Sequence, residues 1–127
     1  MNSSARNAYL GQSIATASPA RLLVMLYDRL VLDLQRAAEA QDASNIAVAS
    51  SNLIHAQEIV LELRTSLKMD VWEGAPRLAS IYAWLHSELV RANISKDVTI
   101  TRDCLKIVEP LAETWRQAAL QSASLAG

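Results

Sequence analysis

The chain has 127 residues, 51% of them hydrophobic, and twelve basic against thirteen acidic side chains give it a formal net charge of −1. This length fits one domain with its own core, and the balanced charge excludes the basic surplus that typically binds nucleic acid or anionic lipid. Because the N-terminus lacks the order of a signal peptide and no apolar run reaches the roughly 20 residues of a membrane span, we expect a soluble cytoplasmic protein.

The first segment of the chain differs from the regular helical patterns after it. Residues 1–17 are expected to form an arm, irregular or briefly helical, whose apolar side chains include Tyr9 and Ile14. Ser18 and Pro19 then mark a helix start. A serine hydroxyl can accept from the free N–H groups of the first turn, and proline at the first helical position loses no hydrogen bond. This junction separates the arm from the helices.

Four later segments repeat apolar residues at steps of three and four, which is typical of helices that pack against neighbours. These seams run through Leu23, Leu26, Leu30, Leu34 and Ala37; through Ile46, Ala49, Leu53, Ala56, Val60, Leu63 and Leu67; through Leu78, Tyr82, Leu85, Leu89 and Ala92; and through Cys104, Val108, Leu111, Trp115 and Ala118. Because the connections are short, the seams predict an all-α antiparallel four-helix bundle over residues 18–122, followed by a frayed tail at 123–127.

Polar residues and helix breakers predict where these helices begin. The expected boundaries are Asp42 or Ser44 as the cap of the second helix, Gly74 with Pro76 before the third, and Ser95 or Asp97 as the cap of the fourth. The β-branched run 98–101 locally prefers extended geometry. Pro110 is expected to kink the last helix, because it removes a backbone donor and crowds the preceding turn.

The first two helices carry apolar side chains away from their seams. The pairs are Met25 with Leu32 on the first helix, and Ile54 with Leu61 and Val48 with Ile59 on the second. The first two pairs are seven residues apart, so the members of each lie on one side of their helix. A compact bundle with wide buried stripes would explain a single pair, whereas three pairs favour an exposed groove. Such grooves accept amphipathic helices, and methionine adapts to varied shapes.

Signals for catalysis or metal binding are weak. A four-helix carboxylate–metal site needs Glu-x-x-His pairs, but Asn52 precedes His55 by three residues and Ala83 precedes His86. Three glycines do not form a Gly-rich phosphate loop. The single cysteine, Cys104, excludes an intrachain disulfide and lies on an apolar seam, where an inert thiol is expected. We therefore expect a non-enzyme with no cofactor and no metal, and phosphotransfer through His55 is the alternative.

A series of short elements resembles the FliS family of flagellar secretion chaperones. They are Ala8-Tyr9, Ile14-Ala15-Thr16-Ala17-Ser18-Pro19, Leu22 with Met25-Leu26-Tyr27-Asp28, Asn52-Leu53 with Ala56-Gln57-Glu58-Ile59-Val60, Glu62-Leu63, Ser66-Leu67, Leu78 with Ile81-Tyr82, Leu89 with Ala92-Asn93, Asp97 and Trp115. The Thr-Ala-Ser-Pro element with Met-Leu-Tyr-Asp close behind it is quite specific. The elements keep the family's order from residue 8 to residue 115, so the resemblance covers nearly the whole chain.

The resemblance implies a bundle that binds the disordered C-terminal segment of flagellin in the cytosol, prevents its premature polymerisation and delivers it to the cytoplasmic domain of FlhA at the export gate. It also implies that the arm caps part of the client groove, with Tyr9 and Ile14 at the positions for capping and for the export-gate contact. Ser18 and Pro19 would then be the helix cap and the hinge of the arm. We assign the client groove to Met25, Leu32, Ile54, Gln57 and Leu61.

Three features depart from the family's pattern. His55 stands where lysine or another polar residue is usual, and the loop 70–76 has one glycine where a Gly-Gly pair is common. Pro110 follows Glu109 in the last helix, which leaves the client path along that helix open. A homo-oligomerising helical scaffold or adaptor without a flagellin client is the alternative function. Whether the free protein is a monomer or a homodimer is also open.

Overall fold

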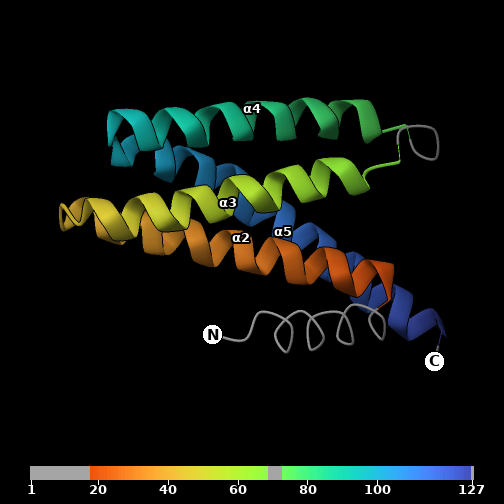
Figure 1. The fold of residues 1–127 in the computed structure, drawn as a ribbon. Coiled ribbons are helices and arrows are strands. Elements are labelled where there is room, and N and C mark those ends of the chain that lie inside the picture. The colour runs from red at the N-terminus through yellow and green to blue at the C-terminus, as the bar shows by residue number, and fades with distance from the viewer. Residues whose placement is uncertain (1–17, 69–72, 127) are drawn as a thin grey trace, which may run out of the picture.

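Four helices account for most of residues 18–68 and 73–126, which are the residues that the computed structural model describes, with side chains as far as Gln121 (Figure 1). The helices are α2 (Pro19–Asp42), α3 (Ile46–Ser66), α4 (Ala75–Ser95) and α5 (Val98–Ala126). Each runs antiparallel to the one before it, and α5 crosses the other three at an angle. Both α2 and α4 pack against α3 and α5. The predicted all-α four-helix bundle is therefore confirmed.

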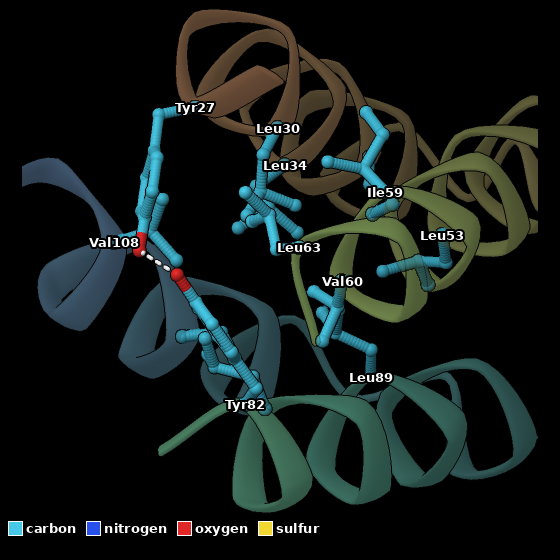
Figure 2. Close-up of a cluster of buried hydrophobic side chains, with 14 of the residues drawn as sticks. Tyr27, Leu30, Leu34, Leu53, Ile59, Val60, Leu63, Tyr82, Leu89 and Val108 are labelled. Atoms are coloured by element: carbon cyan, nitrogen blue, oxygen red, sulfur yellow. Dashed lines mark hydrogen bonds between the residues drawn. The ribbon is translucent and has the colours of Figure 1, made fainter. Parts of the chain in front are cut away.

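The seams predicted for the helices meet in the core (Figure 2). The fully buried large aliphatic side chains are Leu30, Leu34, Leu53, Val60, Leu63, Leu85, Leu89 and Val108. Burying one such side chain stabilises the fold by about 1.5–3 kcal/mol relative to leaving it exposed. Three residues differ from the expectation, and one of them is Ala118 of the predicted α5 seam, which is exposed. Ile46 is exposed because it lies in the first turn of α3, at the end of the bundle, and Ile59, expected outside the seam, is buried.

The Ser18–Pro19 junction begins α2 as the sequence predicts. The Ser18 side-chain oxygen accepts from the backbone N–H of Arg21 at 3.1 Å, and Pro19 is the first helical residue. The cap prediction for α3 was wrong. Asp42 is the last residue of α2 and Ser44 lies in the turn with a positive φ of 57°, so the cap falls to Asn45, whose side chain accepts from the N–H of Val48 at 3.4 Å.

The β-branched run that begins α5 is helical, although its local preference favoured extended structure. Asp97 accepts from the N–H of Thr99 at 2.9 Å and so caps the first turn. Thr101 is fully buried, and its hydroxyl donates to the side chain of Gln41 at 2.6 Å. These contacts outweigh the modest helix penalty of β-branched residues. The helix then continues through Pro110 to Ala126, and so includes much of the segment 123–127 that was expected to be a frayed tail.

A pair of buried tyrosines connects α2 with α4. The hydroxyl oxygens of Tyr27 and Tyr82 lie 2.7 Å apart, and both side chains are almost completely buried (Figure 2). Burial raises the pKa of Tyr27 above the ordinary value of 10.0, against hydrogen bonds from Tyr82 and Trp115 that lower it. Burial also raises the pKa of Tyr82, and its hydrogen bond to Tyr27 adds to this effect.

We expect the stability of the bundle to fall as pH rises above about 10, where the unfolded tyrosines ionise and the folded pair keeps its protons. The contribution of the pair is complete below that pH and is lost as pH rises toward the folded pKa values. The measurement is urea unfolding followed by circular dichroism between pH 8 and pH 11.5. In the control variant Tyr27→Phe/Tyr82→Phe, stability should depend less on pH. Equal slopes in the two proteins would contradict the assignment.

Candidate functional site

A cavity of about 880 Å³ lies between α2 and α5. Its lining residues are Asp28, Val31, Leu32 and Gln35 of α2, and Lys106, Glu109, Pro110, Ala112, Glu113 and Arg116 of α5. The apolar side chains come from both helices, and the charged groups are Asp28 of α2 and four side chains of α5. This combination of an apolar strip and a polar margin is typical of surfaces that receive an amphipathic helix.

A second cavity of about 480 Å³ continues along the same pair of helices toward the start of α2. It is lined by Ser18, Arg21, Val24, Met25 and Asp28 of α2 and by Arg116, Ala119 and Leu120 of α5. Because both cavities include Asp28 and Arg116, they are two parts of one surface that these two side chains cross. We call the two cavities together the α2–α5 groove.

An ion pair between Arg116 and Asp28 bridges the groove. The Arg116 Nη2 atom donates to Asp28 Oδ1 at 2.5 Å, and Nη1 donates to Glu113 on the same helix. The hydrogen bond to Asp28, and then the one to Glu113, raises the pKa of Arg116. Hydrogen bonds from Gln117 and Arg116 lower the pKa of Glu113. The side chains of Arg116, Asp28 and Glu113 are 43%, 51% and 56% exposed, so solvent screens the bridge and it is weak and sensitive to salt.

The two groove residues predicted on α2 lie in this groove. Leu32 is half-buried in the larger part, and Met25 is 43% exposed in the smaller part. They are seven residues apart, so they stand two turns apart on one side of α2. Ser18, the predicted cap and hinge, lines the end of the smaller part. The arm residues Tyr9 and Ile14 lie outside the described residues.

The three groove residues predicted on α3 lie elsewhere. Ile54 is 47% exposed and Leu61 is 43% exposed, whereas Gln57 is half-buried. None of them lines either part of the α2–α5 groove. Their neighbour His55 contacts α2, and Ile54 is turned by about 100° from it around the helix axis. The five predicted residues therefore occupy two regions of the surface.

The α5 wall of the groove was not among the predicted site residues. Pro110, Ala112 and Leu120 belong to it, and Leu120 is strongly exposed. Periodicity finds the buried seam of a helix, but it does not say which neighbour stands beside the other faces. The available signal was the topology, because the first and last helices of an antiparallel four-helix bundle are commonly neighbours.

His55 makes a structural contact between α3 and α2. Its Nδ1 atom hydrogen-bonds the Oδ2 atom of Asp33, and Arg29 Nε donates to Asp33 Oδ1 at 3.1 Å. Asp33 is fully buried, so these two side chains supply the donors that its carboxylate needs inside the bundle. The contact joins α2 to α3 and gives His55 a role that requires no phosphotransfer chemistry.

The other candidate reactive group is Cys104. Burial raises the pKa of its thiol to about 12, so the nucleophilic thiolate is scarce at neutral pH. Within the described ranges, no group of three or more His, Cys, Asp or Glu side chains is arranged to hold a metal ion. None of the helices described is both long enough and apolar enough to cross a membrane.

A smaller apolar surface lies between α4 and α5, away from the groove. It is a cavity of about 370 Å³ lined by Arg77, Ser80, Ile81, Trp84 and Ile107. Trp84 is 43% exposed and Ile107 is 41% exposed, which is close to the exposure of Met25. We call this surface the α4–α5 patch. It provides a matched comparison for experiments on the groove.

Comparisons with known proteins agree on one family. The family model described as "Flagellar protein FliS" matches residues 1–122. The Flagellar secretion chaperone FliS of Bacillus subtilis is 31% identical over 111 residues, which cover 87% of this chain and 83% of that protein. The protein of the same name from Vibrio cholerae is 27% identical over 105 residues, covering 82% and 77%. A solved flagellar chaperone from bacteria has the same fold, with a TM-score of 0.75 at 17% identity over 95% of this chain and 99% of that one.

Proposed function

The chain belongs to the FliS family of flagellar secretion chaperones, and we propose that its client is the disordered C-terminal segment of flagellin. In this proposal the protein binds the segment in the cytosol, prevents its premature polymerisation and delivers it to the cytoplasmic domain of FlhA at the export gate. The observation that carries the proposal is the α2–α5 groove, which leaves apolar side chains uncovered between two helices. Membership of a chaperone family also favours a binding protein over an enzyme.

The groove has the properties that a folding client requires. A disordered segment loses conformational entropy when it becomes helical on the chaperone, and burial of apolar surface at about 25 cal/mol per Å² must offset that loss. Leu32 offers a half-buried contact in the larger part of the groove, and Met25 offers an adaptable one in the smaller part. An amphipathic helix lying along α2 would cover both.

The other predicted site residues also have roles in the proposed function. Ile54, Gln57 and Leu61 form a second contact region on α3, which a client long enough to leave the groove would reach. The arm, with Tyr9 and Ile14, competes for part of the groove and contributes to the export-gate contact. Ser18 caps α2 at the end of the groove, so a hinge at Ser18–Pro19 would let the arm swing over it.

Binding and assembly state are tested together by titrating the full chain with a peptide of the flagellin C-terminal segment. We expect isothermal titration calorimetry to show a one-to-one complex with a negative heat-capacity change, because apolar surface is buried. The peptide should also gain helical circular dichroism. Sedimentation without and with the peptide distinguishes the alternative function: a stable dimer that does not respond to the peptide would contradict the proposal and favour a homo-oligomerising scaffold.

A further inference from the structure

Pro110 is a proline inside a helix, and it stands in the wall of the groove. It lies in the interior of α5, where proline is the least favourable residue, and it lines the larger part of the groove. The other two prolines, Pro19 and Pro76, stand in the first turns of α2 and α4, where proline costs no hydrogen bond. A departure from local consistency of this kind is most often found at functional or strained sites.

Pro110 removes one hydrogen bond from the backbone of α5. Proline has no N–H, so the carbonyl of Lys106 cannot receive the bond that residue 110 would give it in a regular helix. Lys106 and Pro110 both line the larger part of the groove. In an α-helix the carbonyl of a residue points toward the residue four positions further on, so we place the Lys106 carbonyl in the same wall. Backbone carbonyls are strong acceptors, and one without its helical donor takes another where one is offered.

The surroundings of this carbonyl define the chemistry that suits it. Glu109 and Glu113 contribute carboxylates to the same α5 wall, and Lys106 contributes an ammonium group. Arg116 is already engaged with Asp28 and Glu113. Across the groove stand the apolar side chains of Val31 and Leu32. A partner that covers this wall therefore needs an apolar strip and, beside it, a hydrogen-bond donor.

We propose that Pro110 is a specificity residue of the groove, because it makes the Lys106 carbonyl available to a side-chain donor of the bound flagellin segment. The donor is an amide, hydroxyl or ammonium group placed next to the apolar residues that cover Leu32. This inference rests on the proposed function, since it names how the same groove selects its client. The hydrogen bond to the client would account for a proline that otherwise destabilises the interior of α5.

The test is the variant Pro110→Ala, which restores the N–H and lets the helix bond the Lys106 carbonyl. We expect this variant to be more resistant to heat, because an interior proline is removed, and to bind the flagellin peptide about fivefold to tenfold more weakly, as for one hydrogen bond. The matched control is Pro76→Ala in the first turn of α4, which should bind like the unaltered chain.

A double-mutant cycle makes the result specific. Each polar side chain of the peptide is replaced in turn, and one replacement is expected to weaken binding to the unaltered chain about fivefold and to have no effect on Pro110→Ala. Unchanged affinity of Pro110→Ala for the peptide would overturn the inference. An equal loss of affinity for every peptide would also overturn it, because the variant would then act only through the shape of α5. Failure of the unaltered chain to bind any flagellin peptide would instead overturn the proposed function.

Discussion

Aspartate in place of both Met25 and Leu32 is expected to weaken the flagellin complex by about 100-fold or more. Each substitution removes apolar area from the groove and would place a carboxylate under the bound helix, where it must be desolvated without a partner. Two central contacts of this kind, at about 2 kcal/mol or more each, exceed the roughly 2.8 kcal/mol that a 100-fold change requires. Titration calorimetry with the flagellin peptide gives the affinity.

The matched control for this experiment is Ile107→Asp on the α4–α5 patch. Ile107 is 41% exposed, close to the 43% of Met25, so the same substitution adds a similar charge at a similar depth. We expect it to leave peptide affinity unchanged within about twofold. Circular dichroism of both variants verifies that the bundle still forms. If Ile107→Asp weakens binding and the groove variant does not, the client lies on the opposite side of α5.

Removing both donors of Asp33 is expected to cost about 3 kcal/mol of stability or more in the variant Arg29→Ala/His55→Ala. Asp33 is fully buried, whereas the side chains of Arg29 and His55 are 49% and 38% exposed. The cost comes from the carboxylate, which stays inside the bundle without its hydrogen bonds. It does not come from the Coulomb attraction of partly exposed partners, which solvent screens. Urea unfolding followed by circular dichroism measures the free energy of unfolding.

A third substitution separates this explanation from a simple loss of packing. Adding Asp33→Leu to the double variant removes the stranded carboxylate and fills its place with an apolar side chain. We expect stability to recover by at least about 1 kcal/mol, because a buried charge with no partner costs more than its hydrophobic replacement. A triple variant less stable than the double variant would show that Asp33 does not need these donors.

The parts of the fold that depend on local chemistry could be predicted from the sequence. The seam of α4 is buried as expected, and the seam of α2 is buried from Leu30 onward. Ser18 caps α2 because its hydroxyl needs only the first turn to reach a donor. The cap of α3 was misplaced because α2 extends to Asp42, and the periodic pattern does not mark where a helix ends. The helical start of α5 depends on Thr101 reaching Gln41, a contact between residues 60 positions apart.

Only the α2 side of the groove could be predicted from the sequence. Met25 and Leu32 stand out because they interrupt a polar face, and both lie in the groove. Its α5 wall was missed because the neighbour of a helix is set by topology and crossing angle, which periodicity does not encode. Asp33 was missed for a related reason. A single carboxylate beside a seam is expected in solvent unless its partners are known, and His55 is 22 residues away on another helix.

The position of the client along the α2–α5 groove can be tested with intermolecular nuclear Overhauser effects in a methyl-labelled complex with the flagellin peptide. If the client lies in the groove, effects should connect peptide protons with the methyl groups of Met25 and Leu32. Effects confined to Ile81 and Ile107 on the α4–α5 patch, with none at Met25 and Leu32, would contradict this placement.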